Sequence, residues 1–145
     1  MNLTKNFTLE ELCHSSYALR WDIDNTPNEE QIENLKQLCT NILQPLRDAL
    51  GIPMVIDSGF RNHEVNHAVG GSDTSQHTEG KAADVVVPGM AVMDVIRKIV
   101  ELKLPIDQMI FEYGQWTHVS FDKERQRGQI LSKTSGVDGY PPLQL

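Results

Sequence analysis

The sequence predicts an α+β fold, a single domain with a small antiparallel sheet flanked by helices. Short apolar segments typical of strands are mixed with capped helical segments, and two strand segments follow each other closely and join at Gly114, as in a hairpin. The length of 145 residues, of which 39% are hydrophobic, suits one domain with its own core.

The N-terminal part of the chain is predicted to be helical. The sequence TLEE at 8–11 is a capping box with Thr8 as N-cap. The sequence TPNEE at 26–30 predicts a second helix start, with Thr26 as N-cap and Pro27 at the first helical position. Apolar side chains then continue on one face until Gly51, and Pro45 inside this pattern should kink the helix or split it in two.

The rest of the chain predicts both kinds of element. Period-2 or continuous apolar patterns predict strands at 53–58, 83–87, 108–113 and 116–121. Helices are predicted at 62–69, ending at two glycines, and at 90–104, where the pattern is amphipathic.

Charge and composition exclude several function classes. The 13 Lys and Arg against 20 Asp and Glu give a net charge of −7, and the basic residues of 123–127 are dispersed, so we expect no nucleic-acid partner. No segment has the ~20 apolar residues of a membrane span, and the N-terminus has no signal-peptide pattern, so we expect synthesis in the cytoplasm without membrane insertion. Cys13 and Cys39 are expected to be buried thiols, with a single disulfide as the alternative.

Three side chains are candidate metal ligands. His77 lies in a polar loop with glycines, and Asp84 lies at the start of an apolar strand, where a carboxylate is costly unless it is paired or ligated. Strand alternation places His118 on the face opposite to Val119. Two histidines and a carboxylate leave the fourth position of a tetrahedral zinc ion open. The alternative is a hydrogen-bonded structural histidine and an aspartate that only caps a turn.

The same residues carry a family resemblance. The pattern SxHxxGxAxD is followed by WxHVS, which contains His118, and is preceded by IDSGFRNHEVNHAVGGS at 56–72. These three motifs, in this order, resemble the peptidase M15 family of zinc D-Ala-D-Ala carboxypeptidases and phage endolysins. The first pattern is matched by Ser75, His77, Gly80, Ala82 and Asp84.

The resemblance implies a hedgehog/DD-peptidase fold. We expect residues 1–145 to form a single domain of this kind, with 134–145 as an extended or disordered tail because of its Gly, Ser and Pro residues. The resemblance also implies one Zn²⁺ per chain, held by His77, Asp84 and His118. Arg61 would be the substrate-binding arginine, because a guanidinium offers a planar fork to a carboxylate or a developing oxyanion. The alternative is a surface arginine paired with Glu64.

The catalytic base is a separate question. Many relatives carry an acidic residue three positions before the last histidine, where this chain has Gln115, which cannot transfer a proton. Glu112 is the best replacement. A two-residue loop of Gly114 and Gln115 would pair Glu112 with Thr117 and turn it away from His118, whereas a three-residue loop ending at Trp116 would pair it with His118. The alternative is a solvent-facing glutamate.

Other residues have lesser expected roles. Ser75 and Asn66 are candidates to hydrogen-bond a peptide backbone, Trp116 to form an apolar wall beside the metal, and Asp107 to steady the strand of His118. Each is also explained as ordinary loop or core structure. His63 and His67 are off the family's ligand positions and are expected to be exposed helix residues.

The expected function is hydrolysis of a bond in the peptidoglycan stem peptide, as a D-Ala-D-Ala carboxypeptidase or a phage-lysin-type endopeptidase. Zinc would activate a water, and Glu112 would move its proton to the leaving amine. We expect a monomer that acts on the cell wall after phage-type release. One alternative is a catalytically inactive, zinc-containing module that binds the cell wall or belongs to a phage tail. Another is a zinc-independent interaction protein, in which the two histidines and Asp84 form a hydrogen-bonded cluster.

Overall fold

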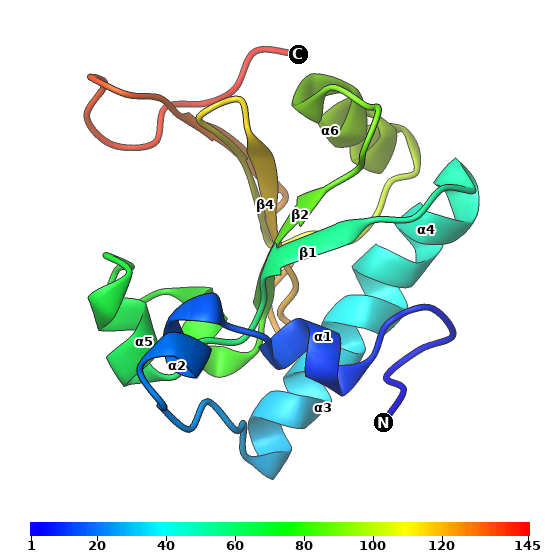
Figure 1. Ribbon diagram of the computed structural model, residues 1–145. Coiled ribbons are helices and arrows are strands. Elements are labelled where there is room, and N and C mark those ends of the chain that lie inside the picture. Colours follow the sequence, from blue (N-terminus) through cyan, green and yellow to red (C-terminus); the bar gives the residue numbers. More distant parts are fainter.

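The computed structural model describes residues 1–145 as a five-stranded sheet with helices against it (Figure 1). The strand order is β1-β2-β4-β3-β5, and all neighbours are antiparallel except β3 and β5, which are parallel. The α+β fold is confirmed, but the sheet is larger than expected and mixed, because β5 was not predicted. The strands are β1 (Val55–Ser58), β2 (Ala82–Val86), β3 (Gln108–Glu112), β4 (Trp116–Ser120) and β5 (Gln129–Lys133).

The helices lie on both sides of the sheet. A π-helical turn, η1 (Cys39–Leu43), joins α3 to α4, and a short 3₁₀ turn, η2 (Gln76–Glu79), precedes β2. In Figure 1, the α3–α4 rod and α6 lie on one side of the sheet, whereas α5 and α2 lie on the other side near its lower end. The helices are α1 (Leu9–Cys13), α2 (Ser16–Arg20), α3 (Glu29–Leu38), α4 (Gln44–Leu50), α5 (His63–Ala68) and α6 (Val92–Glu101).

The core lies between the sheet and the α3–α4 and α6 helices. It is a cluster of 21 buried residues, in which Val85 of β2 and Val119 of β4 face helix residues such as Ile42 and Ile96. Because side chains alternate across a strand, the residues before these two, Asp84 and His118, point to the opposite face of the sheet. Burying the apolar face therefore directs both candidate ligands to the other face.

Two predicted helix starts had different outcomes. Thr8 caps α1, with its hydroxyl accepting a hydrogen bond from the Glu11 backbone N–H, as predicted. The second prediction is wrong by two residues, because the N-cap of α3 is Asn28 and its capping box is completed by Gln31. The hydroxyl and the backbone N–H of Thr26 both donate to the Asp24 carboxylate, so Thr26 belongs to a turn that precedes the helix.

Pro45 divides the long helical segment as predicted. The chain changes from α-helix to the π-helical turn at Cys39 and returns to α-helix at Gln44, so that Pro45 lies in the first turn of α4. Proline has no backbone N–H and clashes with the carbonyl four residues before it. A π-helical turn directly before it accommodates this clash without breaking the rod.

The β3–β4 hairpin has neither of the two predicted loops. Its loop consists of Tyr113, Gly114 and Gln115, and Glu112 pairs with Trp116. Tyr113 and Gly114 both have positive φ, of 57° and 66°, which is the backbone geometry of a type I′ turn. The loop therefore begins one residue earlier than expected, and the register shifts accordingly. Glu112 nevertheless stays on the face of His118, because it lies diagonally from it.

Residues 134–145 return alongside β5. The backbone N–H of Ser132 donates to the carbonyl of Pro141 at 2.8 Å, and that of Leu143 donates to Ile130 at 3.0 Å. Neither cysteine is in a disulfide. Cys39 is buried as expected, but Cys13 is only half-buried. None of the helices has the length and apolar character that crossing a membrane requires.

Candidate metal centre

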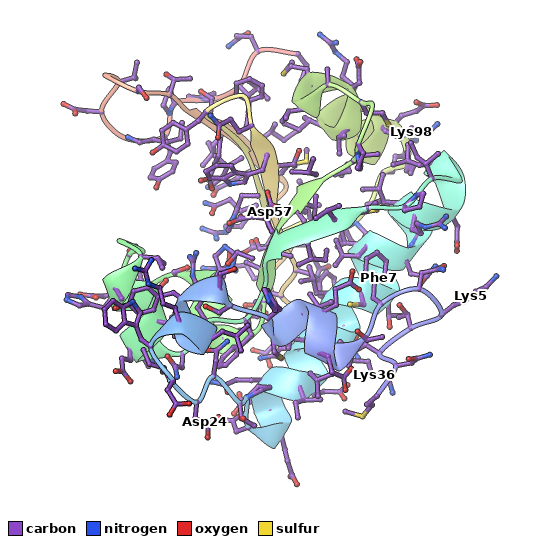
Figure 2. The ribbon with its side chains drawn as sticks, in the orientation of Figure 1. Lys5, Phe7, Asp24, Lys36, Asp57 and Lys98 are labelled. Atoms are coloured by element: carbon purple, nitrogen blue, oxygen red, sulfur yellow. The ribbon has the colours of Figure 1, made fainter.

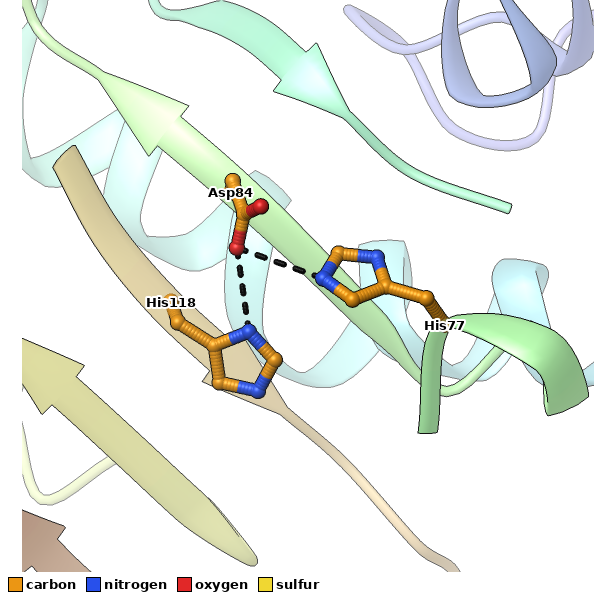
Figure 3. Close-up of side chains that lie close together, drawn as sticks. All are labelled: His77, Asp84 and His118. Carbon is orange, nitrogen blue, oxygen red and sulfur yellow. Dashed lines mark hydrogen bonds and ion pairs between the residues drawn. The ribbon is translucent and has the colours of Figure 1, made fainter. Parts of the chain in front are cut away.

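His77, Asp84 and His118 come together on the sheet face opposite to the core (Figure 3). Oδ1 of Asp84 lies 3.3 Å from Nε2 of His77 and 3.0 Å from Nδ1 of His118. One potential ligand atom from each residue lies within 4.8 Å of the others. Ligand bonds of about 2 Å in a tetrahedral zinc site place ligand atoms about 3.3 Å apart, so the arrangement has the size that such a site needs.

Two local structures position these ligands. Asp84 and His118 are direct partners in the antiparallel β2–β4 pair, which brings their side chains together. His77 is on η2, which begins with the Ser75 hydroxyl accepting from the His77 backbone N–H and ends at Gly80 with a φ of 74°. A residue with a side chain rarely adopts this φ, so Gly80 is needed to turn the chain from His77 into β2.

A backbone carbonyl fixes the ring of His77. Its Nδ1 lies 2.6 Å from the carbonyl oxygen of Gly59, and because a carbonyl can only accept, Nδ1 carries the proton. The lone pair of the neutral ring is then on Nε2, the atom that faces Asp84. Hydrogen bonding of this kind, with the second ring nitrogen bound to a carbonyl, is typical of histidines that ligate metals.

The charge state of the cluster also suits a cation. Burial lowers the pKa of His77, which favours the neutral ring that binds a metal. Burial alone would raise the pKa of Asp84, but His77 and His118 outweigh it and hold this pKa well below its usual range. The cluster therefore offers two imidazoles and one ionised carboxylate, a donor set that fits zinc.

Glu112 lies beside this cluster. Its Oε1 is 3.7 Å from Nδ1 of His118, and its side chain is 18% exposed, so solvent can still reach it. Burial, and secondarily the negative charge of Asp84, raises its pKa above the ordinary value for a glutamate. A second carboxylate thus lies next to the ligands.

Arg61 faces the same group of charges. Burial lowers its pKa, whereas the nearby carboxylates of Asp84 and Glu112 act in the opposite direction. Its Nη1 is 3.4 Å from the Ser58 hydroxyl, and its Nε is buried without a hydrogen-bond partner. The alternative pairing with Glu64 does not occur: Arg61 contacts the Ser58 hydroxyl near the charges of Asp84 and Glu112, whereas Glu64 is exposed.

Sequence reasoning missed Asp57, which a β-bulge places near the cluster. Ile56 pairs with Val85 and Ser58 pairs with Asp84, so Asp57 is an extra residue on β1. In such a bulge two residues oppose one on the partner strand. Asp57 is labelled in Figure 2 near the end of β1 beside β2. The residue is exposed overall, but partial burial of its carboxyl group and the charge of Asp84 raise its pKa. No pattern in the sequence indicates the bulge.

The three residues expected to contact substrate or the metal, Trp116, Asn66 and Ser75, lie in different surroundings. The half-buried Trp116 packs against Tyr113, with ring centroids 5.7 Å apart, at the start of β4 and directly opposite Glu112 on β3. Asn66 is only 2% exposed and donates to the carbonyl of Ser72, so its expected contact with substrate has no support from the structure. The hydroxyl of Ser75 is used in capping η2.

The remaining candidates lie outside the cluster. Gln115 is exposed in the hairpin loop. His63 and His67 are exposed on α5 and belong to no group of potential metal ligands.

The comparison with known families agrees with this geometry. A family model described as peptidase M15 matches residues 5–120, most of the chain, including all three ligand candidates, Glu112 and Arg61. The chain belongs to the peptidase M15 family. No curated protein matches it significantly. Membership in this peptidase family, together with the buried cluster of His77, Asp84 and His118, indicates a zinc-dependent hydrolase of peptide bonds that acts on peptidoglycan.

The family match does not include the C-terminal part of this chain. The matched region ends at residue 120, the last residue of β4, so β5 and the tail lie beyond it. The matched region contains every residue of the metal cluster, and β5 extends the sheet next to β3.

Proposed function

We propose that this protein is a zinc-dependent peptidase that hydrolyses an amide bond in the stem peptide of peptidoglycan, either the terminal D-Ala-D-Ala bond or a bond within the stem. The observation that carries the proposal is the grouping of a three-residue donor set with a separate carboxylate, Glu112, 3.7 Å from His118. Three ligands leave a coordination position open, and a nearby carboxylate outside the donor set is what acid-base catalysis needs.

The residues have separate roles in this proposal. When bound, zinc polarises the substrate carbonyl and makes a water more acidic. Glu112 accepts a proton from that water at Oε1 and later delivers it to the amine that leaves. The raised pKa of Glu112 favours the first of these transfers, because a carboxylate with a higher pKa is a stronger base and accepts a proton more readily.

Arg61 binds the substrate. Its buried Nε has no acceptor in the protein, and such a donor costs about 1–3 kcal/mol while it stays unpaired. A carbonyl or carboxylate of the stem peptide would supply the acceptor. Because the guanidinium keeps its charge, it also favours the oxygen that becomes negative during the reaction.

The test is digestion of purified muropeptides, followed by mass spectrometry. Release of D-Ala identifies a carboxypeptidase and release of a larger fragment identifies an endopeptidase. Cleavage should be lost in His118→Ala and retained in His63→Ala, in which an exposed histidine outside the cluster is removed. Bound zinc without cleavage at any enzyme concentration would refute the proposal in favour of a catalytically inactive wall-binding or phage-tail module. The cell wall as the place of action, reached by phage-type release, belongs to the same proposal.

A further inference from the structure

Asp107, the residue before β3, is a fully buried carboxylate with several donors. Arg127 donates from Nε to Oδ1 at 2.7 Å and from Nη2 to Oδ2 at 2.9 Å, and its backbone N–H donates to Oδ1 at 3.2 Å. A buried carboxylate is costly unless charge and hydrogen bonds compensate it. This pairing therefore fixes the segment around Arg127 against the start of β3.

The same carboxylate reaches the turn that carries His77. Nε2 of Gln76, the first residue of η2, donates to Oδ2 of Asp107 at 2.8 Å. The backbone N–H of Asp107 donates to the carbonyl of Ser120 at 2.9 Å, two residues after His118. Asp107 is thus bonded to the segments that present both histidines, although it touches neither ring.

Arg127 comes from the part of the chain beyond the family match. Its neighbours are also held to the same place, since the backbone N–H of Gly128 donates to Ile106 and that of Gln129 donates to Asp107, both at 3.1 Å. Arg125 differs: its only contact with Asp107 is at 3.4 Å, and its side chain is 53% exposed. Removing Arg127 should therefore break the pairing, whereas removing Arg125 should not.

We propose that Asp107 and Arg127 are positioning residues for the metal centre, and that Gln76 transmits their restraint to His77. This inference rests on the proposed zinc site. The segment just before β5, which contains Arg127 and lies outside the family match, thereby supports His77. Loss of a residue that orients a metal ligand typically costs 10–100-fold in metal affinity, which sets the expected size of the effect.

The experiment measures the zinc dissociation constant of the full chain by competition with a chromogenic chelator. Gln76→Ala and Arg127→Ala should each weaken zinc binding about tenfold. Arg125→Ala is the matched control for the arginine. Gln108→Ala is the control for the amide, because the Gln108 side chain hydrogen-bonds only to the side chain of the exposed Gln129. Both controls should bind zinc like the wild type.

A metal-free measurement separates positioning from general stability. Hydrogen exchange of residues 75–80 should be faster in Gln76→Ala than in the wild type, while the unfolding temperature of the two metal-free proteins stays within a few degrees. If Arg127→Ala does not fold, Arg127→Lys takes its place. This variant keeps the charge but loses the bidentate hydrogen bonding to Asp107, and it should bind zinc with an intermediate affinity.

Two results overturn the inference. One is wild-type zinc affinity in both Gln76→Ala and Arg127→Ala, with only the unfolding temperature lowered. The other is unchanged exchange of residues 75–80. A wild type that binds zinc but cleaves no peptide would refute the proposed function and leave this inference standing. A wild type that binds no zinc would refute the zinc site, and with it this inference.

Discussion

Glu112 and His118 lie on the same face of the β3–β4 hairpin, with Oε1 of Glu112 3.7 Å from Nδ1 of His118. They are diagonal neighbours, since Glu112 pairs with Trp116 and His118 pairs with Ile110. Glu112 is therefore a carboxylate beside the candidate metal centre, whereas Gln115, three positions before His118, is exposed in the hairpin loop.

The first prediction concerns this carboxylate. Glu112→Gln should lower kcat by about 10²–10⁴-fold, because the amide cannot accept a proton, while bound zinc stays at the wild-type level. Gln115→Ala is the matched control, and it should keep wild-type kcat because Gln115 is exposed in the loop. Steady-state kinetics with a stem-peptide substrate measures both. Wild-type kcat in Glu112→Gln would remove Glu112 from the mechanism.

The second prediction concerns substrate binding by Arg61. Arg61→Ala should lower kcat/KM by about 10–100-fold, the worth of one hydrogen bond to a charged group, and Arg61→Lys should recover only part of this. Glu64→Ala should have no effect, because Glu64 is exposed and Arg61 instead contacts Ser58, near Asp84 and Glu112. If Arg61→Ala and Glu64→Ala had equal kinetics, Arg61 would be a surface residue without a role in the reaction.

The third prediction concerns Gly59, whose carbonyl orients His77. A Cβ at this position would collide with the backbone carbonyl of Leu12, which accepts the hydrogen bond of the Phe60 N–H. Gly59→Ala should therefore cost about 1–3 kcal/mol of unfolding free energy, as overpacking does, and also weaken zinc binding. Urea unfolding and chelator competition measure the two effects. A variant with wild-type stability would show that the contact is easily relieved.

The fourth prediction concerns acid stability. Burial disfavours the charged form of Asp107, but hydrogen bonds from Arg127 and Gln76 outweigh this and lower its pKa to about 2. A lowered pKa stabilises the folded state above the unfolded pKa of about 3.9, and this contribution is lost as the pH falls toward 2. The stability difference between wild type and Asp107→Asn, both metal-free, should therefore shrink between pH 4 and pH 2. A difference that is constant across this range would contradict the lowered pKa.

The parts of the fold that depend on nearby residues were predictable. Thr8 and Glu11 are three positions apart, and the capped helix at α1 follows from that spacing. The prediction at Thr26 failed because two local patterns compete within five residues. The box of Asn28 and Gln31 gives two hydrogen bonds to the backbone, whereas Thr26 is engaged by Asp24.

The parts that depend on distant residues were not predictable. Strand β5 exists because its backbone pairs in parallel with β3, and no local pattern records that pairing. The groups that donate hydrogen bonds to Asp107 belong to Gln76 and Arg127, which are far from it in the sequence. The sequence therefore shows a carboxylate before β3 but not its partners. The hairpin loop depended on Tyr113 adopting a positive φ, which is uncommon for a residue other than glycine.

The three candidate ligands follow from the sequence, but their geometry requires the sheet. The polar loop around His77, the carboxylate of Asp84 in an apolar strand and the strand alternation at His118 indicate them, the family resemblance supports them, and the structure places them together. Asp57 could not be found in this way, because its approach to Asp84 results from one extra residue in the β1–β2 pairing.

The most direct test of the central claim is the zinc content of the purified protein by elemental mass spectrometry, with His118→Ala and His63→Ala prepared in parallel without chelator. We predict one zinc ion per chain in the wild type and in His63→Ala, and a large loss of zinc in His118→Ala. Equal zinc content in all three proteins, or none in the wild type, would contradict a metal centre formed by His77, Asp84 and His118.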